Sequence, residues 1–262
     1  MKTKILQMGA DNFGAGGRSV IAYNLTRPLT NDFQVDFLAI GKLKNPSFHQ
    51  IIEENGGQVQ HVKEVSSKIK RLRSIYSILK KEKYDIVHIN ADDAIEGLFN
   101  IILSKLAGAK IVLHAHTTSS SRGEGFIGRL KMLSAKKIVN FLVDYKLACS
   151  LEAADYLYGD TDLSDVAIIK NGIIINDFLY NEELRQNVRE NLNIPMEAIV
   201  LGTIGRLSYE KNPEFMVSLI QTLFSKAPNF YFIWIGDGEE LANIETLLDE
   251  EIKLGRVNML ID

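Results

Sequence analysis

The chain has 262 residues, of which 46% are hydrophobic and 24% are charged, a composition that excludes disordered, collagen-like and coiled-coil chains. It contains no run of roughly 18 apolar residues that could span a membrane, and its opening MKTKILQMGA predicts a first strand and not a signal peptide. The net charge of −3 is unevenly distributed. Residues 1–175 carry 23 Lys and Arg against 18 Asp and Glu, whereas residues 176–262 carry 7 Lys and Arg against 15 Asp and Glu. We therefore expect two domains.

Short apolar runs alternate with amphipathic stretches along the chain, which predicts parallel βαβ units. For the first domain we expect strands at residues 5–8, 35–40, 58–62, 86–89, 111–114, 145–149 and 166–169, with helices near 18–29, 47–55, 67–82, 94–107, 128–142 and 150–158. For the second domain we expect helices near 181–192, 212–226 and 239–253, and strands at 199–204, 230–235 and 257–261. Ligands gather at the carboxyl ends of parallel strands, so the loops after Met8, Ile89 and Leu113 are expected to share one rim.

The first glycine-rich loop, GADNFGAGGRSV, lies between the first strand and the first helix. Its glycines, including Gly14, Gly16 and Gly17, allow the backbone to approach a phosphate or a sugar, and the helix that follows offers free N–H groups. The spacing is not the G-x-G-x-x-G of dinucleotide-binding proteins. Glycines that serve only a tight turn are the alternative.

A second candidate site is LHAHTTSSSRGEG, which follows the fifth strand and carries His114 and His116. Two histidines at alternate positions can form a metal pair, but no acidic or cysteine partner is nearby, so one histidine in contact with substrate is favoured. Asp92 and Asp93 resemble a metal-binding carboxylate pair, although caps of the following helix are favoured. Cys149, the only cysteine, excludes an internal disulfide and is expected to be a buried small side chain.

The segment IVLGTIGRLSYEKNP predicts a strand, a turn at Gly205 and a helix start, with Arg206 and Lys211 in the loop. A helix N-terminus and two cations favour an anion such as a diphosphate leaving group. Isolated surface charges are the alternative. The segment IWIGDGEE, with Gly236 and Gly238, is by itself an ordinary strand-to-helix turn.

The stretch KIKRLRSIYSILKKEK predicts a helix with a basic face outward and an apolar stripe toward the sheet. The stripe consists of Ile69, Leu72, Ile75, Tyr76 and Leu79. A solvated face is one interpretation, and peripheral contact with an anionic membrane is the other. Nucleic acid is less favoured because the net charge is negative. The basic residues of this helix are Lys68, Lys70, Arg71, Arg73, Lys80, Lys81 and Lys83, and those of a second basic helix are Arg129, Lys131, Lys136 and Lys137.

Together with YDIVHIN and the turn in IIKNGI, these segments resemble, in order along the chain, the retaining GT-B-fold glycosyltransferases of family 4. HAHTTSS and GAGGRSV look most like the capsular or exopolysaccharide branch. The resemblance implies two Rossmann-like parallel-sheet domains facing a cleft, with residues 1–175 on the acceptor side and residues 176–262 forming the first half of the nucleotide-sugar domain. It also implies a cytoplasmic enzyme at the inner face of the plasma membrane.

The activity implied by the resemblance is transfer of a sugar from a nucleotide-diphosphate donor, expected to be UDP-linked, to a lipid-linked or saccharide acceptor, with no cofactor and no metal. Arg206 and Lys211 would bind the donor diphosphate, and His116 would lie near the transferred sugar. The other residues carried over as phosphate- or donor-binding are Gly16, Gly17, Asn171, Gly172, Gly205, Gly236 and Gly238.

The sequence departs from the family pattern because it ends at Asp262, before the E-x7-E element that contacts the donor in this family. We therefore expect a fragment of a protein of about 350–380 residues. Two alternatives remain open, a GT-B-fold nucleotide-sugar epimerase and a non-catalytic or decayed fragment. Product analysis without acceptor separates the epimerase from the transferase, and the reading frame after codon 262 tests decay.

Overall fold

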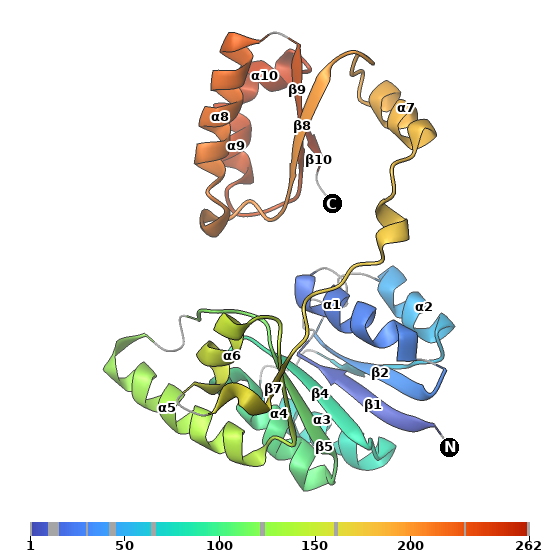
Figure 1. Cartoon of the computed structure of the whole chain (residues 1–262), viewed down its shortest axis with the longest axis vertical. Coiled ribbons are helices and arrows are strands. Elements are labelled where there is room, and N and C mark those ends of the chain that lie inside the picture. Colours follow the sequence, from blue (N-terminus) through green and yellow to red (C-terminus); the bar gives the residue numbers. More distant parts are fainter. Residues whose placement is uncertain are drawn as a thin grey trace. The chain divides into compact units, whose positions relative to one another are not determined.

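The computed structural model describes residues 2–9, 16–29, 31–41, 46–63, 67–120, 124–159, 162–227 and 229–260. The chain divides into two compact units, Met1–Ile175 and Asn176–Asp262, coloured blue to yellow and yellow to red in Figure 1. Each unit is built around one parallel sheet with helices between its strands, as the alternation of apolar runs and amphipathic stretches predicts.

The first unit contains a seven-stranded parallel sheet in the order β3-β2-β1-β4-β5-β6-β7. Its first strand therefore lies near the middle, and the strand order reverses between β1 and β4, where parallel sheets place their ligands. The strands are β1 (Thr3–Met8), β2 (Phe33–Ile40), β3 (Val59–Val62), β4 (Ile86–Ala91), β5 (Lys110–Ala115), β6 (Tyr145–Ala148) and β7 (Val166–Ile168).

The helices of the first unit bury apolar side chains on both faces of this sheet (Figure 1). Helices α1 and α2 pack with Ile5 and Phe37 on one face, while α3, α4 and α5 pack with Leu6 and Ile89 on the other. This alternation of neighbouring residues between the two faces is expected of a strand. The helices are α1 (Gly17–Thr26), α2 (Pro46–Glu54), α3 (Lys68–Glu82), α4 (Ala94–Ala107), α5 (Gly125–Leu142) and α6 (Leu151–Tyr158), with short 3-10 turns at Arg27–Leu29 and Leu163–Asp165.

The second unit contains a three-stranded parallel sheet in the order β10-β9-β8. Its core joins Phe232 and Trp234 of β9 to Val217 and Ile220 of α8. The elements are α7 (Glu182–Asn191), β8 (Ile199–Ile204), α8 (Pro213–Lys226), β9 (Phe230–Ile235), α9 (Leu241–Leu247), α10 (Asp249–Lys253) and β10 (Val257–Leu260), with a 3-10 turn η5 (Tyr209–Lys211). A further 3-10 turn, η4 (Ile175–Phe178), begins at the last residue of the first unit.

Most predicted elements are confirmed within a few residues, but three expectations need correction. The helix expected at 239–253 is two helices, because the backbone leaves helical geometry at Leu248 while its side chain stays buried in the core. Ile69, assigned to the buried stripe of α3, is 63% exposed. Cys149 is only partly buried, although it packs against the core.

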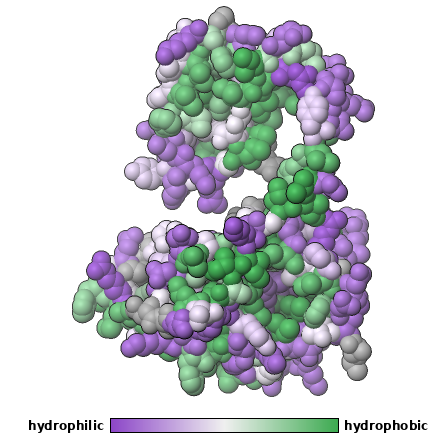
Figure 2. Space-filling model, viewed as in Figure 1, coloured by the Kyte–Doolittle hydropathy of each residue, from purple (hydrophilic) through white to green (hydrophobic). Residues whose placement is uncertain are grey.

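The segment that joins the two units is rich in exposed apolar side chains. Ile173, Ile175, Phe178 and Tyr180 are all more than half exposed, and Figure 2 shows hydrophobic residues gathered along this segment. Within the described residues, no helix combines the length and the apolar character needed to cross a bilayer.

Candidate active site

Polar side chains cluster at the carboxyl ends of the central strands of the first unit. β1 carries Gln7, β4 carries His88 and Asn90, and β5 carries His114 with His116 directly after it. The register pairs Gln7 with His88 and Asn90 with His114. All except His116 are less than 9% exposed. Because buried polar groups are costly unless they are hydrogen-bonded, their partners define what this cluster can do.

Asn90 connects the end of β1 to His116. Its Nδ2 donates to the backbone oxygen of Met8 at 3.1 Å and to Oε1 of Gln7 at 3.0 Å. The backbone carbonyl of Met8 can only accept a hydrogen bond, so the Asn90 amide must turn its nitrogen, and not its oxygen, toward it. Oδ1 therefore faces Nε2 of His116 at 2.8 Å, and His116 donates from this nitrogen. In a neutral ring, Nδ1 is then left as a hydrogen-bond acceptor.

The side-chain amide of Gln7 connects Asn90 to His88. Because Oε1 of Gln7 accepts from Asn90, Nε2 of Gln7 donates to Nδ1 of His88 at 2.9 Å. His88 thus carries its proton on Nε2, which is buried and has no hydrogen-bond partner among the described residues. Both ring nitrogens of His114 are likewise buried and have no partner in the described part of the chain. Among the residues that the structure describes, Asn90 therefore connects His116, and not His114, to the polar network.

The three imidazoles form a stack with His114 in the middle. Its ring lies 5.5 Å from that of His88, at 9° between the planes, and 4.2 Å from that of His116, at 36°. Burial, with a smaller contribution from a neighbouring imidazole, lowers the pKa of His88 and of His114 to about 3 and that of His116 to about 4. All three rings are therefore neutral at physiological pH.

The two carboxylates before α4 have different partners. Asp93 caps the helix, because its Oδ1 accepts from the N–H of Glu96 at 2.8 Å. Its other carboxylate oxygen, Oδ2, accepts from the hydroxyl of Ser120 at 2.6 Å. Asp92 lies 3.5 Å from the guanidinium of Arg18. The cap interpretation is thus confirmed for Asp93. No group of three potential metal ligands occurs among the described residues, and the absence of a metal requirement stays a prediction.

Three residues of this rim were not predicted from the sequence, namely Gln7, Asn90 and Arg18. Arg18 lies in the first turn of α1 and contacts the carboxylate of Glu96 at 3.2 Å. A signal for the first two was present, because Gln7 and Asn90 interrupt strands that are otherwise mostly apolar. A buried polar residue near the carboxyl end of a parallel strand is a reason to suspect a site.

The glycine-rich loop lies partly outside the described residues, including Gly14. Gly9 has a φ of +78°, and a Cβ atom there would collide with the backbone oxygen of Asn90. Gly16 is the N-cap of α1, and Gly17 is its first residue, where no atom of the described residues lies within 4 Å of the place of a Cβ. Close packing therefore requires glycine at Gly9, whereas the described residues would leave room for a Cβ at Gly17.

The turn expected at Asn171 and Gly172 is absent from the structure, in which both residues lie in an irregular segment beside α1 of the same unit. The backbone oxygen of Gly172 accepts a hydrogen bond from Nδ2 of Asn24 at 3.3 Å. Both Asn171 and Gly172 are exposed. The first unit thus contains Gly16, Gly17, His116, Asn171 and Gly172 of the predicted set.

Two loops of the second unit are bonded together through their backbones. The N–H of Gly205 donates to Ile235, and the N–H of Leu207 donates to Asp237, both at 3.0 Å. A Cβ atom at Gly236 would collide with the backbone of Gly205, and one at Gly238 with that of Leu207. These glycines therefore permit the close approach of the turn after β9 to the turn after β8.

The turn after β8 carries the two predicted cations. Arg206 and Lys211 are both exposed, and no hydrogen bond or ion pair of their side chains occurs within the described residues. The pKa of Glu210 is lowered by hydrogen bonds from Ser208 and from its own backbone N–H, and the charges of Arg206 and Lys211 lower it further. Both cations thus lie near the same carboxylate, at the exposed end of β8 and beside the start of α8.

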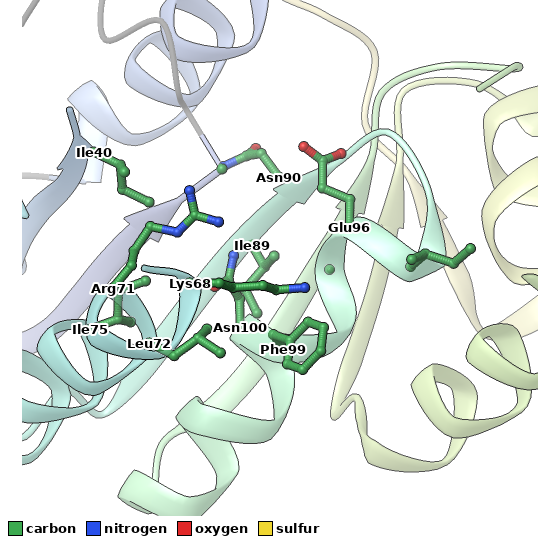
Figure 3. Close-up of a pocket in the computed structure, with 13 residues that line it drawn as sticks. Ile40, Lys68, Arg71, Leu72, Ile75, Ile89, Asn90, Glu96, Phe99 and Asn100 are labelled. Atoms are coloured by element: carbon green, nitrogen blue, oxygen red, sulfur yellow. The ribbon is translucent and has the colours of Figure 1, made fainter. Parts of the chain in front are cut away.

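The basic residues of α3 divide between two surroundings. Lys68 places its Nζ 4.2 Å from the centre of the Phe99 ring, and Arg71 is half-buried. Both line a cavity between α3 and α4, shown in Figure 3. Lys68 is nevertheless exposed, so the prediction that the basic face is outward is wrong only for Arg71. The remaining basic residues of the helix are exposed as well, namely Lys70, Arg73, Lys80, Lys81 and Lys83.

Comparison with solved structures shows a fold shared with two-domain sugar-nucleotide proteins. HepE of Anabaena, solved in complex with UDP and glucose, has a TM-score of 0.74 and 17% identity over 100% of this chain and 69% of its own. The UDP-GlcNAc 2-epimerase of Neisseria meningitidis has a TM-score of 0.62 and 12% identity over 100% of this chain and 72% of its own. The α/β GT-B fold class is confirmed, and it does not by itself separate transferase from epimerase.

Sequence comparison gives the family. EpsF of Bacillus subtilis is 25% identical over 254 residues, which are 92% of this chain and 65% of EpsF. The UDP-Gal:alpha-D-GlcNAc-diphosphoundecaprenol alpha-1,3-galactosyltransferase of Escherichia coli is 25% identical over 207 residues, 74% of this chain and 51% of that protein. The chain thus spans less than two thirds of each of these relatives. The family model for Glycosyltransferase Family 4 matches residues 15–177, more than half of the chain, and the chain therefore belongs to glycosyltransferase family 4.

Proposed function

We propose that the protein transfers a sugar from a UDP-linked donor to a lipid-linked or saccharide acceptor in bacterial surface polysaccharide synthesis, with retention of the anomeric configuration. The first unit would serve the acceptor and the second unit the donor. The observation that carries this proposal is the exposed pair of cations, Arg206 and Lys211, in a loop braced by the turn after β9. Family membership and the named activity of the E. coli relative support it.

In the proposed reaction, the bond between the anomeric carbon and the β-phosphate oxygen breaks while the acceptor hydroxyl bonds to that carbon on the same face. The proton of the acceptor hydroxyl passes to the departing phosphate oxygen, so charge and atoms balance. Negative charge grows on the diphosphate as it leaves. Arg206 and Lys211 stabilise that charge, because positioned cations act most strongly where charge develops.

His116 is proposed to orient the transferred sugar. Its pKa of about 4 keeps the ring neutral, and Asn90 holds the proton on Nε2. Nδ1 is then an acceptor for a sugar hydroxyl, so His116 contributes a directed hydrogen bond and not a positive charge. This role follows from the tautomer that the Asn90 amide selects.

Binding of UDP to the 262-residue chain, measured by isothermal titration calorimetry, tests the donor assignment. Arg206→Ala and Lys211→Ala are each expected to weaken binding by about tenfold or more, the usual effect of losing a charge-assisted contact. Lys226→Ala is the matched control, because Lys226 is an exposed cation at the far end of α8. Unchanged affinity in both loop variants, with unchanged sugar transfer, would refute the assignment.

A nucleotide-sugar epimerase is the second candidate function, because the chain shares its fold with the Neisseria enzyme. An epimerase releases an altered nucleotide sugar in the absence of any acceptor. Incubation with UDP-sugar alone, followed by chromatography of the nucleotide sugars, separates the two functions. Acceptor-dependent release of UDP supports the transferase.

Peripheral contact with an anionic membrane is also proposed, and α5 adds support to the basic helix α3. Phe126 and Phe141 of α5 are 84% and 87% exposed, and Leu130 between them is 58% exposed. The helix carries Arg129, Lys131, Lys136 and Lys137 and no acidic residue. Exposed aromatic and basic side chains together suit an anionic bilayer surface. Flotation with anionic vesicles but not with neutral ones is expected, and equal recovery on both would contradict this contact.

A further inference from the structure

A cavity of about 490 Å³ lies between α3 and α4 at the carboxyl ends of β1, β2 and β4. Its described walls come from Gly9, Ile40, Asn90 and the facing sides of the two helices. The volume falls within the range of small-ligand sites. Figure 3 shows Lys68 and Arg71 extending from α3 into this space, with Asn90 and Glu96 at one side and Phe99 at the other.

The charge of this cavity favours an anion. Lys68 and Arg71 line the cavity from the first turn of α3, which has no acidic residue, and that end of a helix already carries partial positive charge. The one acidic residue among the described walls, Glu96, accepts from the guanidinium of Arg18 at 3.2 Å and from the N–H of Asp92 at 2.7 Å. The positive charge of Lys68 and Arg71 is therefore not neutralised by Glu96. Cations near the N-terminus of a helix do not stabilise it, so an anionic ligand is the better explanation for the position of Lys68 and Arg71.

Most of the remaining wall is apolar, and Asn100 is its polar member. Ile75 and Ile89 are buried in the core, whereas Leu72 and Ile95 are partly exposed and Phe99 is 42% exposed. A free inorganic anion or a bare sugar would leave these three exposed apolar side chains uncovered. A ligand that joins an anion to a hydrocarbon chain would cover both parts of the wall.

Asn90 places the cavity next to the proposed reaction centre. The residue lines the cavity, and its Oδ1 accepts from Nε2 of His116 at 2.8 Å. A ligand bound between α3 and α4 would therefore lie one residue away from the histidine proposed to contact the transferred sugar.

We propose that this cavity binds the diphosphate of a lipid-linked acceptor, with Lys68 and Arg71 on the phosphates and the apolar wall on the first units of the lipid chain. This inference rests on the proposed function for its identification of the acceptor. It assigns to the first unit a diphosphate site separate from the one proposed at Arg206 and Lys211 in the second unit.

Calorimetric titration of the 262-residue chain with farnesyl diphosphate tests the proposal, with inorganic pyrophosphate and UDP as separate titrants. At about 0.15 M salt, which screens diffuse attraction, saturable binding of farnesyl diphosphate is expected. Lys68→Ala and Arg71→Ala should each weaken it by about tenfold or more. Lys70→Ala and Arg73→Ala remove the same charges from positions of the same helix that do not line the cavity, and should change affinity less than about threefold. Phe99→Ala should weaken farnesyl diphosphate but not pyrophosphate.

The proposal would be overturned by an absence of saturable binding to the unaltered chain, by equal losses in all four charge variants, or by pyrophosphate binding as tightly as farnesyl diphosphate. The outcome is independent of the donor test. Loss of UDP binding in Arg206→Ala together with intact farnesyl diphosphate binding supports two sites. Farnesyl diphosphate binding that disappears in Arg206→Ala would place the lipid diphosphate in the second unit and reject the cavity.

Discussion

Replacing Asn90 by leucine should remove the connection between β1 and His116 and destabilise the first unit. The variant loses three hydrogen bonds and leaves two buried acceptors, Oε1 of Gln7 and the backbone oxygen of Met8, without this donor. Each orphaned buried group costs about 1–3 kcal/mol, and burial of the leucine side chain offsets part of the sum. We therefore expect the free energy of unfolding to fall by about 2–4 kcal/mol.

The chain contains its own reference for this measurement. Trp234, the only tryptophan, is buried in the core of the second unit. In a urea titration, tryptophan fluorescence follows the second unit, whereas circular dichroism follows both. Asn90→Leu should shift only the transition of the first unit. His114→Leu is the matched control, because it places the same side chain in the same buried rim, where the imidazole has no hydrogen bond to lose.

The tautomer of His116 gives a second readout that a purely structural role of Asn90 would not move. Long-range nitrogen–proton NMR spectra of histidine-labelled protein should show the proton of His116 on Nε2 in the unaltered chain and a mixture of tautomers in Asn90→Leu. A proton on Nδ1 in the unaltered chain would refute the hydrogen-bond reasoning. Equal destabilisation by Asn90→Leu and His114→Leu would refute the energetic part.

Two further predictions concern the stability of the separate units. The three stacked histidines have folded-state pKa values of about 3 to 4, below the roughly 6.5 of an unfolded chain, so the unfolded state binds more protons between these values. The free energy of unfolding of the first unit should therefore fall as the pH drops from about 6.5 toward 4, by up to about 1.4 kcal/mol per pH unit for each histidine. The second unit contains no histidine, so its free energy of unfolding should not show this fall. Equal acid sensitivity of both units in pH-dependent urea titrations would contradict this. Gly238→Ala should lower the urea midpoint seen by Trp234, because its Cβ would collide with the backbone of Leu207, and a wild-type midpoint would show that this contact relaxes freely.

The periodicity of the sequence predicted nearly all elements because each strand and helix is encoded by neighbouring residues. The runs at 199–204 and 230–235 match β8 and β9, and the helix at 94–107 matches α4. The cap at Asp93 was also predictable, since its partner is three residues away. The break at Leu248 was not, because a helical pattern continues through it and only packing of Leu248 into the core interrupts the helix.

By itself, the sequence determined the two-domain α/β organisation, the family resemblance and the loops that carry His116, Arg206 and Lys211, since these depend on local patterns. Only the tertiary structure decided which side chains meet. Asn90 joins Met8 and His116 across 82 and 26 residues of sequence, and the direction of Lys68 and Arg71 is set by the packing of α3 on α4. Such pairings arise from strand order and from the burial of polar groups that must find partners, and neither is written in the spacing of neighbouring residues.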